Sequence, residues 1–175
     1  MATADILARA ANIKLVIFDV DGVLTDGKLF FDEQGREYKS FHARDGLGLN
    51  LLRQSGVEVA VISGRTSLVV AQRMAHLGIS RVFQGQHNKL PAFDSLRAEL
   101  GLDAAQIAHV GDDLLDLPLL RRVGLAVAVA DANPAILPFA HWHTRQPGGA
   151  GAAREVCDLI MQAQGNLQAA VEGYY

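Results

Sequence analysis

The sequence predicts an α/β protein with a doubly wound parallel sheet and helices on both faces. Short apolar runs rich in β-branched residues recur along the 175 residues, and stretches with helical spacing separate them. Strands that alternate with helices of this length form βαβ units, and the helices bury both faces of the parallel sheet. The predicted architecture is therefore Rossmann-like.

Five apolar runs have the length and composition of strands. They cover residues 13–18, 57–62, 81–84, 107–110 and 124–129. Glycine or polar residues follow them closely and favour a turn at the end of each strand. Their nearly continuous apolar character, without polar alternation, is typical of strands that are buried on both faces of a sheet.

Helical spacing fills the gaps between these strands. Apolar residues recur at intervals of three and four over residues 47–53, 67–76, 89–100 and 114–123. A final helix is expected over residues 152–164, after a glycine-rich segment. Each of the four strand-to-strand connections is therefore long enough to be a crossover between parallel strands.

The length predicts one globular domain. A chain of 175 residues buries roughly 70% of the surface that its unfolded form exposes. We expect a single domain over residues 1–175, with its core over about 12–164 and a flexible tail over 165–175.

The charge and the apolar runs indicate which classes of partner and which cellular location to expect. The formal net charge of −3, without a basic stripe, predicts no nucleic-acid partner. No apolar run approaches the roughly 18 residues of a membrane span, and no secretion signal is visible at the start. Cys157 is the only cysteine and lies in an apolar helical stretch, where packing is its expected role. We therefore expect a cytoplasmic protein without a membrane partner.

The segment over residues 27–41 predicts a protruding β-hairpin after the first strand. It lacks helical spacing and contains a glycine-bearing turn between two short β-type runs. Aromatic residues are frequent in it, namely Phe30, Phe31, Tyr38 and Phe41. Packing on the same domain and contact with another subunit explain these side chains equally well.

Two carboxylates follow the first strand where open α/β sheets bind ligands. Asp19 and Asp21 come directly after that strand, and Gly22 lets the chain turn at once. One carboxylate can bind a metal and attack an electrophile while the other reaches the same substrate from the side. For this motif alone, an acidic turn that ends a strand is the simpler interpretation.

Other strand ends also carry polar groups. Ser63 ends the second strand, Lys89 opens the helix after the third, and Asp112 and Asp116 follow the fourth. Because the carboxyl ends of parallel strands share one edge of the sheet, these side chains are expected to converge. Taken singly, Ser63 could be a helix cap and Lys89 a solvated helix residue. Asp113, beside Asp112, is as readily a solvated cap as a ligand.

Phosphoryl transfer is the chemistry that needs this set. A phosphate monoester repels an attacking carboxylate, so the site must neutralise charge before attack. Mg²⁺ prefers hard oxygen ligands, and we expect it on Asp19, Asp112 and the backbone carbonyl of Asp21. Asp116, four residues after Asp112, would support the metal through water or hold Lys89.

Each remaining group then has a chemical role. Asp19 is the expected nucleophile, which forms an aspartyl-phosphate. Asp21 is the expected general acid for the leaving alkoxide and then the base that activates water. Ser63 would donate a hydrogen bond to a phosphate oxygen, and Lys89 would supply positive charge to the phosphate and to the attacking carboxylate.

These strand-end motifs, in this order over residues 19–116, resemble the four signatures of the haloacid dehalogenase superfamily of phosphohydrolases. Residues 41–48, 84–89 and 148–155, together with the hairpin in place of a cap domain, resemble the 3-deoxy-D-manno-octulosonate 8-phosphate phosphatase family. This resemblance covers nearly the whole chain. It implies a capless, Mg²⁺-dependent homotetramer that removes phosphate from an eight-carbon keto sugar acid on the way to lipopolysaccharide. It also implies that the hairpins pack around the tetramer and that a neighbouring subunit helps to close each site.

The implied substrate explains several cationic residues. A sugar acid carries a carboxylate as well as a phosphate, and arginine suits bidentate binding of carboxylates. A surface charge is the alternative role for each arginine. By resemblance, the substrate pocket is lined by Asp21, His42, Ala43, Arg44, Asp45, Gly46, Asn50, Arg65, Arg73 and Lys89.

Two C-terminal segments have competing interpretations. The spacing of His141 and His143 suits a metal, but without a third ligand it favours a short strand. The glycine-rich residues 148–151 form either a linker or a backbone segment that closes over a ligand.

Three rival functions stay open at this point. A phosphatase for another eight- or nine-carbon sugar acid would share every motif, because pocket shape decides among such substrates. A phospho-accepting signalling receiver also combines acids, Ser or Thr, Lys and a doubly wound sheet. Its phosphorylated Asp ends the third strand, however, where this chain has Gln84 and Gly85. A non-catalytic scaffold would leave the occupied catalytic positions unexplained.

Overall fold

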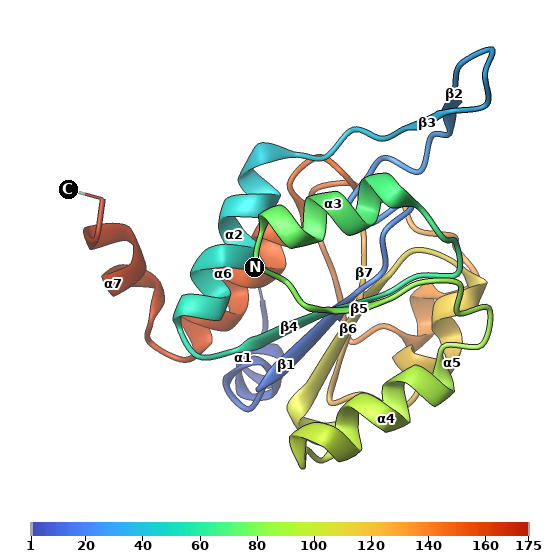
Figure 1. Ribbon diagram of the computed structural model, residues 1–175. Helices are drawn as coiled ribbons and strands as arrows, with labels where there is room; N and C mark the ends of the chain where they lie inside the picture. The colour runs from blue at the N-terminus through green and yellow to red at the C-terminus, as the bar shows by residue number, and fades with distance from the viewer. Residues whose placement is uncertain (1, 175) are drawn as a thin grey trace.

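The computed structural model describes residues 2–174 and confirms the predicted α/β architecture (Figure 1). Its main sheet has six strands, and every neighbouring pair is parallel. In spatial order these are β5 (Arg81–Phe83), β4 (Glu58–Ile62), β1 (Leu15–Phe18), β6 (Ile107–Gly111), β7 (Leu125–Ala128) and β8 (Trp142–His143).

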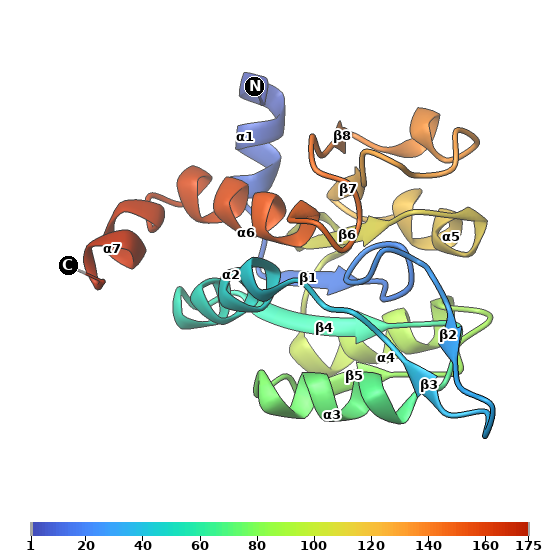
Figure 2. The same cartoon turned by 90° about the horizontal axis from the view of Figure 1, so that it is seen from above.

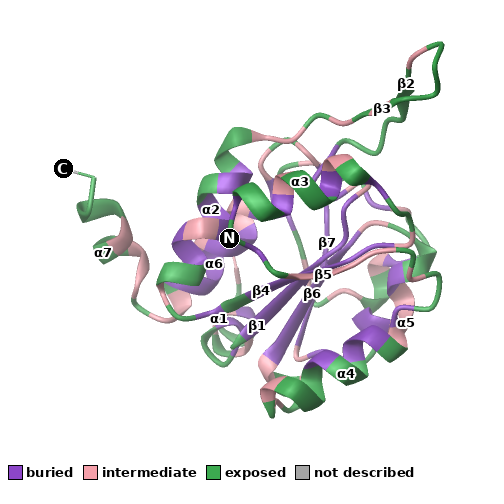
Figure 3. Cartoon of the chain, viewed as in Figure 1, coloured by how far each residue is buried: buried purple, intermediate pink, exposed green. Residues whose placement is uncertain are grey.

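The central strand β1 is fully buried in the sheet. All four of its residues are buried, and Leu15 pairs with Glu58 of β4 on one side and with Ile107 of β6 on the other. Figure 3 shows the same burial along the neighbouring strands. The continuous apolar runs therefore face helices on both sides, as the sequence predicts.

The helices lie in two layers (Figures 1 and 2). One face carries α2 (Ala43–Gln54), α3 (Leu68–His76) and α6 (Ala152–Ala163), and the other carries α4 (Leu90–Leu100) and α5 (Leu117–Leu120). Right-handed crossovers place consecutive helices on one face until the strand order reverses at β1. The reversal puts a crevice at the carboxyl end of β1, beside the two aspartates.

Several helical elements differ from the sequence prediction. The chain begins with α1 (Ala4–Ala11), which packs on α6, and the helix expected over 114–123 is divided into the 3₁₀ turn η2 (Leu114–Asp116) and α5. The expected flexible tail contains α7 (Leu167–Glu172), which buries none of its residues, and Tyr175 lies outside the described residues. Two further 3₁₀ turns are η1 (Ala104–Gln106) and η3 (Leu137–Phe139).

The predicted hairpin protrudes from the body of the molecule (Figures 1 and 2). Its strands β2 (Phe30–Phe31) and β3 (Glu37–Tyr38) form a separate antiparallel pair. Phe30, Phe31 and Tyr38 are each more than half exposed, at 51%, 56% and 53%, whereas Phe41 packs on the core. Within this chain, most of the hairpin's aromatic surface is therefore uncovered.

None of the helices within residues 2–174 is both long enough and apolar enough to cross a membrane. The short strand predicted around His141 and His143 is present as β8, which begins one residue after His141. The His141 ring accepts a hydrogen bond from the Ala126 amide at 2.9 Å.

Candidate active site

The sheet topology brings Asp19 and Lys89 into contact. Asp19 continues β1 by donating its amide hydrogen bond to Val110 of β6 at 3.0 Å, and its side chain lies at the carboxyl edge of the sheet. Lys89, at the start of α4, is only 1% exposed, and its Nζ lies 2.8 Å from Asp19 Oδ1. A charged ammonium is stable at such depth only beside carboxylates.

Asp116 is the second partner of Lys89. Its Oδ1 accepts a hydrogen bond from Lys89 Nζ at 2.7 Å and lies 2.8 Å from His109 Nε2. Asp116 Oδ2 accepts hydrogen bonds from the amides of Asp112 and Asp113 at 2.9 and 3.3 Å. Both oxygens of Asp116 are therefore engaged, which favours its predicted role as the residue that holds Lys89.

His109 is a buried partner that the sequence prediction did not identify. It lies inside β6, is 0% exposed, and its Nδ1 is 3.1 Å from the Ile17 carbonyl oxygen. Because a carbonyl oxygen only accepts, Nδ1 is the donor in this contact. The ring thus connects the backbone of β1 to Asp116, and a polar residue within the apolar run 107–110 was the available sequence signal.

Three carboxylates form a site that fits a divalent cation. One oxygen each from Asp19, Asp112 and Asp116 lies within 4.8 Å of the others. Asp19 Oδ1 is buried and, apart from its ion pair with Lys89, has no hydrogen-bond partner among the described residues. A Cβ on Gly22 would lie 2.1 Å from Asp112 Oδ2, so only glycine leaves room for this carboxylate. The hard oxygen donors and their spacing fit Mg²⁺.

The three acids of the cluster have pKa values that are shifted in different directions. Burial, and then the charges of Asp19 and Asp116, raise the pKa of Asp112 to about 8. Burial and then Asp116 also raise the pKa of Asp19, against the opposing charge of Lys89. Burial opposes ionisation of Asp116 as well, but hydrogen bonding to His109 and the charges of His109 and Lys89 outweigh it and lower that pKa.

The raised pKa of Asp112 makes Mg²⁺ binding dependent on pH. Below pH 8 this carboxyl is mostly protonated in the metal-free site, so the cation must displace a proton. We expect the apparent Mg²⁺ affinity to rise roughly tenfold per pH unit up to about pH 8 and then to level off. Calorimetric titration in buffers of different ionisation enthalpy measures both affinity and proton release. Asp112→Asn should bind more weakly and lose the slope, and a flat profile for the unsubstituted protein would contradict the expectation.

Asp21 is held by a residue of the hairpin and by one of the loop that follows β4. Its Oδ1 accepts a hydrogen bond from Lys39 Nζ, and its Oδ2 lies 3.6 Å from Arg65 Nε. Glu37 connects the same two cations, since its Oε1 is 3.2 Å from Lys39 Nζ and 3.1 Å from Arg65 Nη2. The sequence prediction included Asp21 and Arg65 but missed Glu37 and Lys39.

Ser63 lies where the sequence places it, at the end of β4. It is 3% exposed, and its Oγ accepts a hydrogen bond from the Arg65 amide at 3.4 Å. The Ser63 amide donates to Phe83 of β5 at 2.9 Å, which fixes the strand end. The weak contact to Arg65 leaves the hydroxyl proton of Ser63 available to an anion.

A second group of predicted residues surrounds a small cavity at the start of α2. His42, Asp45, Gly46 and Arg73 line it, and Arg73 lies with Cζ 5.8 Å from the centroid of the Phe41 ring. Arg73 Nε and His42 Nδ1 are buried without a hydrogen-bond partner among the described residues. The cavity has a volume of only about 10 Å³, room for about one water molecule, so the two unpartnered nitrogens fit a small polar group or one oxygen of an anion.

Asp45 also holds another helix, and two further predicted residues of α2 do not line the cavity. The Asp45 carboxylate is 2% exposed and accepts hydrogen bonds from the Gly151 and Arg154 amides at 3.3 and 2.8 Å, so it caps the start of α6. Ala43 begins α2 and is exposed, and Asn50 lies half-buried two turns later.

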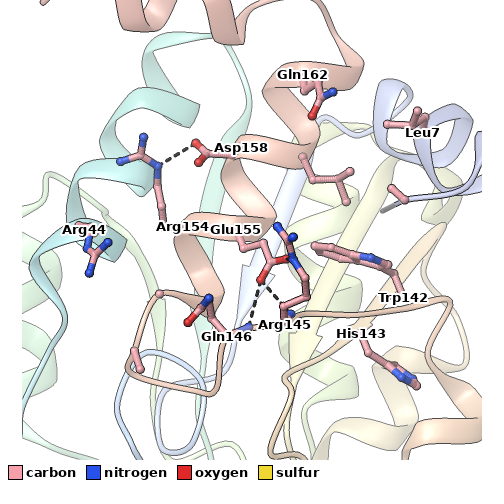
Figure 4. A pocket seen from close by; sticks show the side chains of 14 residues that line it. Leu7, Arg44, Trp142, His143, Arg145, Gln146, Arg154, Glu155, Asp158 and Gln162 are labelled. Carbon is pink, nitrogen blue, oxygen red and sulfur yellow. Dashed lines mark hydrogen bonds and ion pairs between the residues drawn. The ribbon is translucent and has the colours of Figure 1, made fainter.

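Arg44 lines a different surface, a groove of about 970 Å³ between α1, α6 and β8 (Figure 4). Arg145 and Arg154 in this groove are paired with Glu155 and Asp158, at 2.9 and 2.8 Å. None of the aspartates of the carboxylate cluster lines the groove. The structure therefore does not bring Arg44 together with the cluster within one chain.

The glycine-rich segment lies against the loop that follows β1. The Gly149 amide donates to the Val23 carbonyl at 2.9 Å, and a Cβ on Gly148 would lie 1.7 Å from the Gly22 carbonyl oxygen. Asp131 holds the segment by accepting a hydrogen bond from the Gly148 amide at 2.8 Å. In this structure the segment supports the loop that follows β1 by direct backbone contact.

This contact predicts that Gly148→Ala damages the site. Backbone cannot yield as a flexible side chain does, so the loop at Gly22 must shift, at a cost of about 1–3 kcal/mol in unfolding free energy. Mg²⁺ affinity should fall as well, because Gly22 lies against Asp112. Urea unfolding and Mg²⁺ titration measure the two effects. Gly173→Ala is the matched control, since its added Cβ would come no closer than 3.8 Å to other atoms, and equal behaviour of both variants would contradict the prediction.

Comparisons with known proteins agree with this geometry. Residues 75–155 match a family described as haloacid dehalogenase-like hydrolase. The 3-deoxy-D-manno-octulosonate 8-phosphate phosphatase of Escherichia coli K12 is 50% identical over 168 residues, which cover 96% of this chain and 89% of the relative. The Yersinia pestis protein of the same name is 50% identical over 166 residues, 95% of this chain and 89% of the relative.

Solved structures give the same result. The Moraxella catarrhalis phosphatase of this name, in complex with a magnesium ion, a phosphate ion and a KDO molecule, has a TM-score of 0.97 at 40% identity and covers 99% of this chain and 100% of its own. The cobalt-bound Haemophilus influenzae phosphatase has a TM-score of 0.90 at 43% identity, covering 95% of this chain and 98% of its own. With such identity over nearly its whole length, the chain belongs to the 3-deoxy-D-manno-octulosonate 8-phosphate phosphatase family of haloacid dehalogenase-like hydrolases.

Proposed function

We propose that this protein hydrolyses 3-deoxy-D-manno-octulosonate 8-phosphate to the free sugar acid and phosphate, with Mg²⁺ as cofactor. The observation that carries the proposal is the cluster of Asp19, Lys89, Asp112 and Asp116, in a chain half identical to enzymes named for this reaction. The magnesium, phosphate and KDO in the Moraxella catarrhalis relative support both the metal and the ligand. The reaction belongs to lipopolysaccharide biosynthesis.

The proposed chemistry gives a role to each of three side chains. The Asp19 carboxylate attacks phosphorus, the bond from phosphorus to the sugar oxygen breaks, and Asp21 gives a proton to the leaving alkoxide. Asp21 then removes a proton from the water that hydrolyses the aspartyl-phosphate, which restores Asp19. Lys89 remains beside Asp19 at 2.8 Å and offsets the charge that builds up around the phosphate.

The metal would be held by Asp19, Asp112 and the backbone carbonyl of Asp21, with Asp116 fixing the loop through its two amide contacts. When bound, Mg²⁺ neutralises phosphate charge and orients the ester for in-line attack. Ser63 donates its hydroxyl to a phosphate oxygen in this proposal.

The carboxylate of the substrate needs its own cations. We assign this task to Arg73 and His42, whose buried nitrogens lack partners within the described chain, and to Arg65, which is 45% exposed beside Asp21. Arg44, which lies in the other groove of its own chain, would reach a site only across a subunit boundary. Ala43, Asp45, Gly46 and Asn50 shape the segment that carries His42.

The test is phosphate release from 3-deoxy-D-manno-octulosonate 8-phosphate, with Mg²⁺ and with chelator, beside a panel of other sugar-acid and simple sugar phosphates. Strong preference for the octulosonate, lost with chelator, is the expected result. Equal turnover of another eight- or nine-carbon sugar acid would overturn the substrate and keep the mechanism. No turnover of any ester would overturn the phosphatase assignment.

The hairpin supports a further part of the proposal, a homotetramer. Three aromatic residues that are half exposed in one chain form a surface that suits contact between copies. Light scattering on the unsubstituted protein and on the double variant Phe30→Ser/Phe31→Ser tests this, with a tetramer expected for the former and smaller species for the latter. A monomeric unsubstituted protein would contradict it. The cytoplasmic location expected from the sequence is likewise a proposal, which cell fractionation would test.

A further inference from the structure

Lys39 is a buried cation that the mechanism above does not use. It follows β3 at the base of the hairpin, and its side chain has 0% exposure within a single chain. Burying an ammonium is costly unless carboxylates surround it, so its partners define its role. Those partners are Asp21 and Glu37.

The contacts of Lys39 form a frame around the Asp21 side chain. Lys39 Nζ donates to Asp21 Oδ1, and Arg65 Nε lies 3.6 Å from Asp21 Oδ2, so each carboxylate oxygen faces one cation. Glu37 links these two cations at 3.2 and 3.1 Å and accepts a hydrogen bond from the Ser67 hydroxyl. These contacts therefore connect the base of the hairpin to the loop after β4 through Asp21, which is both the proposed general acid and the proposed general base.

We propose that Lys39 is a positioning residue for Asp21. Through Lys39, the hairpin orients the Asp21 side chain toward the leaving group that it protonates. This inference rests on the proposed phosphatase chemistry. Of the two cations, Lys39 is the one with rigid surroundings, because the Arg65 side chain is 45% exposed while that of Lys39 is fully covered. Without Lys39, the Asp21 carboxylate loses its only hydrogen-bonded side-chain partner among the described residues and can rotate away from the ester oxygen.

Substrates with different leaving groups separate this role from a structural one. A sugar alkoxide needs a proton as it leaves, whereas 4-nitrophenolate leaves readily without one. The ratio kcat/KM covers the steps up to release of the leaving group, so the two substrates report the use of the acid. Positioned acid catalysis is worth about 10²–10⁴-fold.

We expect Lys39→Met to lower kcat/KM for the octulosonate phosphate by about 10²-fold and for 4-nitrophenyl phosphate by less than about fivefold. Asp21→Asn should show the same imbalance. The double variant should be no worse than Asp21→Asn alone, because both substitutions remove one function. Lys39→Arg should restore part of the activity toward the sugar ester. Lys28→Met is the matched control, because Lys28 is 71% exposed in the same hairpin and should leave both ratios unchanged.

Other outcomes overturn the inference. Equal losses on both substrates would make Lys39 a structural residue, and a raised KM with unchanged kcat on the sugar ester alone would make it a substrate ligand. Additive losses in the double variant would also contradict it. If the unsubstituted protein cleaves other alkyl phosphates but not the octulosonate ester, the substrate proposal fails, and the Lys39 comparison proceeds with that alkyl ester.

Discussion

Asp19→Asn abolishes phosphatase activity, by at least about 10⁴-fold in kcat, if Asp19 is the nucleophile. An amide has nearly the shape of the carboxylate but forms no acyl-phosphate under these conditions. The fold should persist, because the hydrogen bond from the Asp19 amide to Val110 is a backbone contact and Lys89 keeps Asp116 as its partner. Phosphate release and mass spectrometry of acid-quenched protein measure the loss of turnover and of the phosphoenzyme.

The control for this substitution is Asp5→Asn, which changes an exposed carboxylate that pairs with Arg9 on α1. It should leave turnover and the phosphoenzyme signal unchanged. A phosphoenzyme that survives in Asp19→Asn would move the nucleophile to another carboxylate, for which Asp112 and Asp116 are the alternatives within the cluster.

Lys89→Met should be costly to stability as well as to catalysis. Burial opposes the charge on Lys89, but Asp116 and Asp19 outweigh it and raise its pKa, so the ammonium is the counter-charge of two buried carboxylates. Removing one member of a buried ion pair costs about 3–5 kcal/mol of unfolding free energy. We also expect kcat to fall by about 10²–10³-fold, since a preorganised positive charge is lost. Urea unfolding with chelator present and steady-state kinetics provide the measurements.

The loss of stability in Lys89→Met should depend on pH in one direction only. A lysine whose folded pKa is raised contributes stability that is complete below its unfolded value and is lost only as pH rises through the folded value. The difference between Lys89→Met and the unsubstituted protein should therefore not shrink between about pH 7 and 9, below the ordinary lysine pKa of about 10.4. Excess Mg²⁺ should recover part of the stability by neutralising the carboxylates. Lys14→Met, at an exposed lysine, should change neither quantity, and a deficit below about 1 kcal/mol for Lys89→Met would contradict the ion-pair account.

The strand-end chemistry could be predicted because it depends on local sequence and on one rule of topology. Residues 13–18 are apolar apart from Lys14, and half of them are β-branched, so Asp19 was expected to follow a buried strand. Parallel strands were then expected to bring Lys89 and Asp116 to the same edge. The structure shows the contacts between Lys89 and each of these acids at 2.8 and 2.7 Å. Hydrophobic periodicity was sufficient for this part of the site.

The groups that the sequence prediction missed depend on pairing across long distances in the chain. Glu37 and Lys39 share one face of an extended strand, with Tyr38 on the other, but only the direction of the hairpin shows that this face meets Asp21. Asp45 caps a helix more than 100 residues away, at the Arg154 amide. Local patterns predict which residues form an element and cannot predict which distant backbone a carboxylate will meet.

The support of the Gly22 loop by Gly148 has a consequence for the order of events during synthesis. A nascent chain carries Asp19 and Asp21 almost from the start, but β1 lacks its partner β6 until residues 107–111 emerge. The backbone that fixes the loop arrives later still, at Gly148 and Gly149. Because such distant contacts must close long loops, the first acidic motif of the chain is among the last parts to become functional. A ribosome-bound fragment that ends before Gly148 would contain all the aspartates of the cluster and should release no phosphate.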